Sequence, residues 1–172
     1  MAKSDSFFLR ASILVDDSAT YDQVEINLGS YVDALGKSVL RIHNMSYEVT
    51  DSTGLAPNMD AAKSGSVTFQ LVTQSQTSIV TLADKAVIAK GMIWCRNTDA
   101  SNSAPPAESF SEDVTPQIFT NGYLVATENI FLGASADTNW AGTANLTVSI
   151  LLECTVETMS QSAAMALALS QQ

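Results

Sequence analysis

The sequence of 172 residues predicts an all-β protein, an antiparallel β-sandwich in which one face of each sheet packs on a shared core. The clearest observation is Asn145–Glu157, where apolar side chains take every second position. A strand directs successive side chains to opposite faces, so this segment has one apolar and one mostly polar face. Phe7–Val15 and Gln23–Leu28 alternate in the same way. Strands with two different faces are typical of antiparallel sheets that cover a core on one side.

Length and composition suit one domain, residues 1–172, with a sizeable core. Hydrophobic residues make up 46% of the chain and charged residues 15%. The charged share is below the ~25% that is usual for soluble domains, and it suits a subunit whose surface is largely buried in an assembly. The net charge is −10, and no cluster of Lys and Arg is present to neutralise phosphates. Direct binding of nucleic acid is therefore not expected.

The first half of the chain begins with a small, polar N-terminal arm, residues 1–6, followed by the two strands named above. The next run, Ser38–Thr50, changes phase, because Leu40 is an even apolar position and Met45 an odd one. A one-residue phase change moves every later side chain to the other face. We therefore expect a β-bulge near His43–Asn44, or a passage of the strand from one sheet to the other there.

The middle of the chain is harder to interpret. Asp51–Ser66 is expected to be a loop before a strand at Val67–Val72. Ile79–Lys90 fits either a helix or a strand edge; a short helix or turn is favoured, followed by a strand at Gly91–Arg96. Asn97–Thr115, nineteen residues with two prolines, is the clearest loop and is either a surface excursion or a contact loop between subunits.

Another strand is expected to begin at Pro116–Phe119, before a turn at Asn121-Gly122. Tyr123–Leu132 then predicts a strand that breaks near Glu128-Asn129. The small residues of Gly133–Thr143 predict a loop.

Two features remain near the C-terminal end of the chain. Trp140 is either tucked under the edge of the sandwich, which we favour, or exposed as an anchor for a partner. Residues 158–172 are expected to be a tail or a short helix. A helix this short must dock, either on its own domain or on a neighbouring subunit.

Residue types that carry catalysis are scarce. His43 is the only histidine, Cys95 and Cys154 are the only cysteines, and no nucleotide-binding motif is present. A site of nitrogen and sulfur ligands needs several such residues. The sequence predicts no enzyme and no cofactor. The two cysteines lie in apolar runs, and sequence alone leaves open whether they are bridged.

Clustered acids are the weak exception, because a calcium ion needs several oxygen ligands at one place. The candidates are Asp16 and Asp17 with Asp22, or Glu112 with Asp113, in each case at a contact between subunits.

A short arm leading into Phe7–Val15, the hairpin-like Tyr123–Leu132 and the long last strand Asn145–Glu157 together resemble viral single-jelly-roll capsid proteins. The resemblance covers most of the chain in pattern and implies a jelly roll of about eight strands. It also implies self-assembly into an icosahedral shell and a place in the virion after synthesis in the host cytoplasm. Many small capsid proteins carry an Arg-rich arm, which this chain lacks, so genome neutralisation would fall to another protein, a membrane or counterions.

Under this hypothesis the partners are other copies of the chain, with other virion proteins as a further option. The interface candidates are apolar side chains in loops, on outer faces and in the C-terminal segment: Phe110, Trp140, Leu151, Met165 and Leu167. Leu151 is the one apolar residue on the outer face of its strand and would contact the C-terminal segment or a neighbouring subunit.

The alternative is a ligand-binding jelly roll, such as a carbohydrate-binding or receptor-binding head, with Trp140 and Tyr123 as an aromatic platform. No signal peptide is apparent, so export by that route is not expected. No run reaches the ~18 apolar residues of a membrane span.

Overall fold

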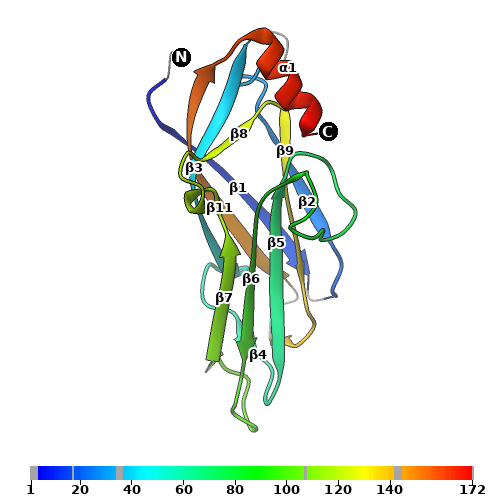
Figure 1. Cartoon of the computed structure of the whole chain (residues 1–172). Helices are drawn as coiled ribbons and strands as arrows, with labels where there is room; N and C mark the ends of the chain where they lie inside the picture. Colours follow the sequence, from blue (N-terminus) through cyan, green and yellow to red (C-terminus); the bar gives the residue numbers. More distant parts are fainter. Residues whose placement is uncertain (1–3, 17, 34–36, 107, 142–144, 172) are drawn as a thin grey trace.

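The computed structural model describes residues 4–16, 18–33, 37–106, 108–141 and 145–171. Two antiparallel sheets pack face to face, and one short helix follows the last strand (Figure 1). The predicted all-β, antiparallel sandwich with a C-terminal helical segment is confirmed.

The first sheet has the order β1-β11-β3-β8. Its strands are Phe7–Asp16 (β1), Asn145–Thr158 (β11), Ser38–Asp51 (β3) and Tyr123–Val125 (β8). The second sheet has the order β2-β9-β5-β6-β7. Its strands are Asp22–Asn27 (β2), Asn129–Ala136 (β9), Ser64–Val72 (β5), Val87–Arg96 (β6) and Glu108–Val114 (β7). A separate two-stranded ladder joins β4 (Asn58–Met59) to β10 (Trp140–Ala141).

This order is that of a jelly roll. The first and last strands are neighbours in one sheet, and β2 and β9 are neighbours in the other. The chain therefore crosses between the sheets after β1, β2, β3, β7, β8 and β9, whereas β5, β6 and β7 follow one another within the second sheet. β7 lies outside the eight-stranded roll, as an added edge strand beside β6.

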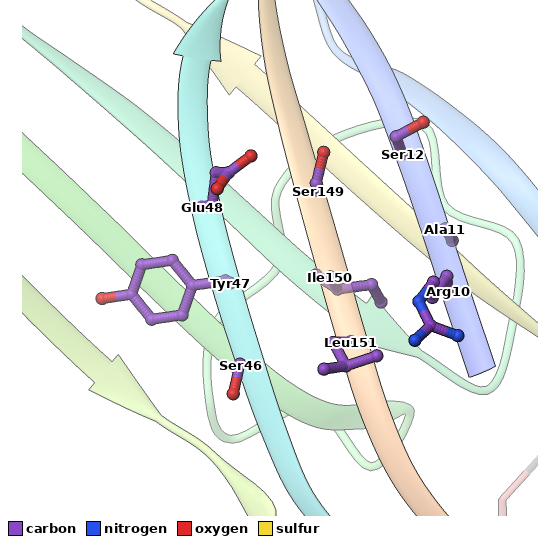
Figure 2. A pocket seen from close by; sticks show the side chains of 9 residues that line it. All are labelled: Arg10, Ala11, Ser12, Ser46, Tyr47, Glu48, Ser149, Ile150 and Leu151. Carbon is purple, nitrogen blue, oxygen red and sulfur yellow. The ribbon is translucent and has the colours of Figure 1, made fainter. Parts of the chain in front are cut away.

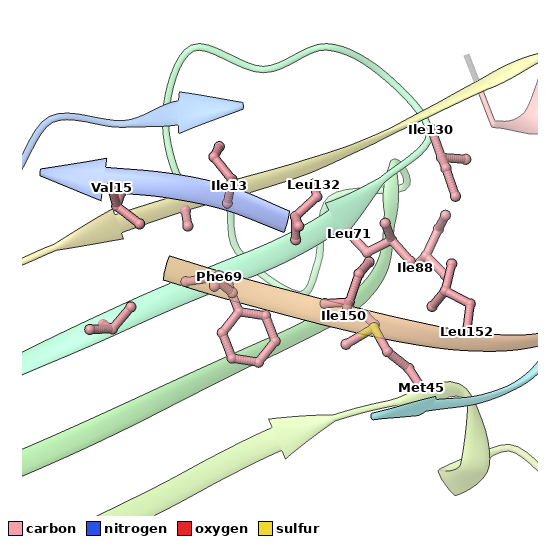
Figure 3. Packing of buried hydrophobic residues seen from close by; sticks show 14 of the residues in the cluster. Ile13, Val15, Met45, Phe69, Leu71, Ile88, Ile130, Leu132, Ile150 and Leu152 are labelled. Carbon is pink, nitrogen blue, oxygen red and sulfur yellow. The ribbon is translucent and has the colours of Figure 1, made fainter. Parts of the chain in front are cut away.

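One continuous core fills the space between the sheets. Phe69, Leu71 and Leu132 of the second sheet pack toward Met45, Ile150 and Leu152 of the first (Figure 3). All of these side chains are at most 3% exposed. Each apolar side chain buried in this way contributes roughly 1.5–3 kcal/mol to folding. The alternation of the sequence therefore specifies which face of each strand this core covers.

The predicted β-bulge is present. Asn44 pairs with Glu153 and Ile42 with Cys154, so His43 has no residue opposite it in the ladder. The extra residue keeps Ile42 and Met45 on the same buried face. The His43 Nε2 atom lies 2.8 Å from Thr155 Oγ1.

Two predictions for the middle of the chain are wrong: the expected loop Asn97–Thr115 contains the edge strand β7, and β6 begins at Val87 rather than at Gly91. Of the two forms favoured for the start of Ile79–Lys90, a short helix or a turn, the turn is confirmed, because residues 82–86 form turns and no helix is present there. Ile88 and Ala89 are both buried although they are consecutive, because the ladder shifts register there, opposite Leu71 and Val72.

Several boundaries also differ. Pro116–Ile118 is a 3₁₀ turn rather than a strand, since proline at its start cannot donate to a ladder. The expected loop Gly133–Thr143 includes the end of β9 and the short β10, and the expected loop Asp51–Ser66 includes β4 and the start of β5. The predicted break near Glu128-Asn129 is real: it separates β8 from β9, which belong to different sheets.

The predicted C-terminal helix is α1, Gln161–Ser170, and it docks on its own domain. The Ser160 hydroxyl caps it by accepting a hydrogen bond from the Ala163 amide. Its buried side chains, Ala164 and Ala168, pack in a small cluster with Val39 and Ala126.

Candidate functional site

Exposed apolar side chains of the described residues mark the candidate contact surfaces, because large exposed apolar groups gather at interaction sites. They lie on β1, on the neighbouring strands β6 and β7, around the 3₁₀ turn, on α1 and in two loops. The residues are Phe8, Leu14, Trp94, Phe110, Ile118, Phe119, Met165, Leu169, Leu55 and Leu82.

The β1 edge is the longest of these surfaces. β1 ends its sheet and pairs only with β11, so alternate backbone groups have no partner strand. On its outer face Phe8 is 52% exposed and Leu14 is 59% exposed. The Arg10 guanidinium lies 6.0 Å from the centre of the Phe8 ring.

A shallow depression of about 530 Å³ lies on the outer face of the same sheet (Figure 2). Its floor follows the ladder: Leu151 stands between Arg10 of β1 and Ser46 of β3, and Ser149 stands between Ser12 and Glu48. Leu151 is half-buried there. The C-terminal helix packs elsewhere, in the cluster around Val39, so it is not the partner of Leu151.

An aromatic pair marks the edge of the second sheet. Trp94 and Phe110 are directly opposite each other on β6 and β7, and they are 39% and 55% exposed. A groove of about 850 Å³ runs beside them. Its lining is mixed, with apolar, basic and acidic members: Ile79, Leu82, Met92, Val114, Lys90 and Glu112.

The rest of the second sheet's outer face is covered by the chain itself. Gln70 points outward from β5 but is fully buried, because residues 73–86 cross over it. Its side-chain amide donates to Ser78 O at 3.0 Å and to Tyr21 Oη at 3.1 Å, and it accepts from the Val80 amide at 2.8 Å. Burial raises the pKa of Tyr21, partly offset by its hydrogen bond with Gln70.

Polar contacts fix the C-terminal end of the chain. The Gln171 side chain accepts from the Ala126 amide at 3.0 Å and donates to Leu124 O at 2.6 Å. The Gln171 carbonyl accepts from Thr73 Oγ1 at 2.7 Å. One residue therefore connects the helix to strand β8 of the first sheet and to the loop after β5 of the second.

A paired charge lies nearby on the outer face of the first sheet. Arg41 Nε and Nη2 donate to the two carboxylate oxygens of Glu157, at 2.7 and 2.8 Å. These hydrogen bonds raise the pKa of Arg41, and Arg41 also donates to Asn121 O.

The structure decides between the two alternatives for Trp140. The side chain is 4% exposed and belongs to the core, so it is tucked and not an exposed anchor. Its Nε1 has no hydrogen-bond partner among the described residues. The aromatic platform of Trp140 and Tyr123 that the ligand-binding alternative required is not formed.

The calcium candidates are not brought together. Asp17 lies outside the described residues, and Asp16 accepts hydrogen bonds from Ser18. Glu112 and Asp113 are consecutive on β7 and therefore point to opposite faces. No group of three His, Cys, Asp or Glu side chains gathers within the described ranges. Cys95 and Cys154 are both buried and unbridged.

The sequence interpretation missed Trp94 and Gln70. The signal for Trp94 was present, since Trp94 and Arg96 alternate with Ile93 and Cys95, which pack in the core. Gln70 carried no comparable signal, because an outward polar residue is normal until a loop covers it. In the ranges described, no helix is long and apolar enough to cross a membrane.

The sequence matches no protein-family profile and no curated protein. It aligns in structure with the human polyomavirus 6 VP1 pentamer at 7% identity, with a TM-score of 0.43 over 90% of this chain and 95% of that chain. The cyanophage Pam1 capsid aligns at 13% identity, with a TM-score of 0.40 over 88% of this chain and 84% of that chain. Desmodium yellow mottle tymovirus aligns at 9% identity, with a TM-score of 0.39 over 90% of this chain and 89% of that chain.

Proposed function

We propose that the chain is a single-domain coat subunit that assembles with further copies of itself into a virion shell. One observation carries the proposal: in this jelly roll, the exposed apolar side chains are spread over several separate surfaces, which include the β1 edge, strands β6 and β7, the 3₁₀ turn and the C-terminal helix. A shell subunit needs several separate contact surfaces, because each copy touches several neighbours. A small-molecule site would instead concentrate its apolar groups in one concave pocket.

The proposed contact residues are Phe110 on β7, Leu151 in the outer depression, and Met165 and Leu167 on α1. Phe110 and Met165 are 55% and 43% exposed, and Leu151 and Leu167 are half-buried. Trp140 is not among them, because its side chain already lies in the core. The partners are further copies and, in a complete particle, other virion proteins.

Electron microscopy of the purified protein tests the proposal. We expect closed particles of uniform size at high protein concentration, in a series of salt and Ca²⁺ concentrations. Ca²⁺ is included because Asp16, Asp22, Glu112 and Asp113 carry like charges that a cation at a contact would neutralise. A folded protein that forms no particles under any of these conditions would contradict the proposal.

A pair of variants locates the contacts. Phe110→Asp should prevent particle formation while the domain stays folded, because the side chain is exposed in the isolated chain. Leu55→Asp is the matched control: Leu55 is 67% exposed, but it lies in the loop after β3 rather than on a sheet edge. We expect particles from this variant.

A ligand-binding role is the second candidate, and the exposed pair Trp94 and Phe110 is the observation that favours it. Exposed aromatic rings beside polar neighbours can stack on sugars. A glycan array discriminates the two: specific binding that Trp94→Ala abolishes would support a carbohydrate-binding head.

A further inference from the structure

We infer that two copies of this chain pair their β1 strands antiparallel across a two-fold axis and so join their four-stranded sheets into one continuous sheet. The inference rests on the proposed function and names one of its contacts: the partner is a second copy, and the surface is the edge of β1. A free edge strand offers main-chain hydrogen bonds to an added strand.

The charge on the sheet edges singles out β1. The edge strand β7 carries Glu112 and Asp113, and the edge strand β2 carries Asp22 and Glu25. Pairing either strand with its own copy would bring acids together, and charged edges are a usual protection against such pairing. The remaining edge strand, β8, is only three residues long.

β1 is different in length and in charge. It has ten residues, and its only charged side chains are Arg10 and Asp16, which have opposite signs. Self-pairing therefore does not require acids to face each other, as it would at β2 and β7. Outer-face side chains that would flank the new contact, Phe8 and Leu14, are already more than half exposed.

The core is also incompletely covered along this side. Phe7, Leu9 and Ala11 point inward from β1, but they are only half-buried. Val24 and Ile26, on the edge strand of the second sheet, are half-buried as well. A second copy at this edge would shield both rows, and apolar area removed from water contributes about 25 cal/mol per Å².

A register follows from the strand itself. Pairing centred on Ala11 keeps residues 7–15 of both copies opposite each other. Phe8 of one copy then faces Leu14 of the other on the outer face, and Arg10 faces Ser12. No like charges are opposed in this register.

A charge exchange tests both the contact and the register. Phe8→Lys and Leu14→Glu should each weaken the dimer about tenfold or more, because the two-fold axis repeats every lost apolar pair and each buried charge lacks a partner. The double variant should recover most of the affinity, since the new ammonium of one copy then faces the new carboxylate of the other. Residues 8 and 14 are too far apart along β1 for the two charges to meet within one chain, at about 3.3 Å per residue.

Sedimentation velocity of the full chain over a concentration series measures these affinities, and circular dichroism confirms that each variant is folded. The control is Leu55→Lys in the loop after β3, which is 67% exposed and should leave the dimer unchanged. A wild-type protein that stays monomeric throughout the series would overturn the inference. So would single variants that dimerise normally, and a double variant that remains monomeric would overturn the register.

Particle formation is read separately by electron microscopy. Particles whose yield is unaffected by Phe8→Lys would leave the proposed function standing and remove this contact. A β1-dependent dimer that never forms particles would support this contact and contradict the proposed function.

Discussion

The two sheets differ most on the faces that point away from the core. The second sheet is covered over β5 by its own chain: residues 73–86 cross it there, and Gln70 is fully buried beneath them. The middle of the first sheet is bare, with a shallow depression in which three serines and the longer Arg10 and Glu48 surround Leu151 (Figure 2). The comparison teaches that the second sheet covers its centre with its own chain and leaves β6 and β7 open, whereas the first sheet leaves its centre and the long β1 edge open.

The largest expected effect is on the covered face. Gln70→Ala removes a fully buried amide and leaves Val80 N and Ser78 O without their partner. Unsatisfied buried groups cost about 1–3 kcal/mol each, so we expect a loss of about 3 kcal/mol in the free energy of unfolding. Urea denaturation measures it. Ser149→Ala, at a half-buried position on the bare face, is the control and should change stability by less than about 0.5 kcal/mol.

The second effect concerns the ion pair between Arg41 and Glu157 on the first sheet. Arg41→Ala leaves the Glu157 carboxylate, 6% exposed, without its bidentate partner. A full loss of about 3 kcal/mol applies to deeply buried pairs; because Arg41 keeps some contact with water, we expect about 2 kcal/mol. Glu157→Gln retains a hydrogen-bond acceptor and should cost less. An equal cost for both variants would mean that charge contributes little here.

Each sheet has one cysteine that points into the core, Cys95 on β6 and Cys154 on β11. Their thiols test whether the inner faces of the two sheets are equally protected from solvent. Burial and, secondarily, the Glu153 carboxylate raise the pKa of Cys154 to about 12, from an ordinary value of 9.0. Burial also raises the pKa of Cys95. A thiol whose pKa is higher in the folded protein than in the unfolded one favours the folded state fully at a pH below its unfolded pKa. This contribution to stability is lost as the pH rises through the folded-state pKa. We therefore expect unfolding to become easier between about pH 9 and pH 12.

Thiol labelling gives the same comparison at neutral pH. The reactive species is the thiolate, so neither cysteine should react until the protein unfolds. Rapid labelling of Cys95 alone in the native protein would show that the second sheet opens locally while the first stays closed.

The smallest effect on stability is expected from Leu151→Asp, on the bare face. The side chain is half-buried in an open depression, so the domain should stay folded with a loss of about 1 kcal/mol or less. Particle formation should weaken. Global unfolding would instead show that this face is as essential to the fold as the covered one.

Long two-faced strands could be predicted from the sequence because a buried face imposes strict alternation. β1, β3 and β11 have such faces, and the phase change in Ser38–Thr50 even located the bulge. The helix after Ser160 was predicted because small and apolar residues there lack turn signals.

β7 could not be predicted because it owes its structure to a neighbour. Its sequence, Glu108–Val114, has no continuous apolar face, because Glu112 interrupts Phe110 and Val114, and the ladder to β6 holds it in place. The start of β6 was missed for a related reason, since a register shift buries consecutive residues. Strand pairing itself, and the burial of Gln70 by a loop, are properties of the folded chain that no local pattern encodes.

The pairing of β1 with β11 has a consequence for synthesis. Asp16 is opposite Asn145 and Phe7 is opposite Cys154, so the first strand has its neighbour in the ladder only near the end of the chain. While the ribosome is still translating the middle of the chain, both edges of β1 lack a partner. Contacts this distant in sequence form slowly because a long loop must close first. Folding of the nascent chain should therefore finish only after β11 has left the exit tunnel, and premature termination before Asn145 should release a product prone to aggregate.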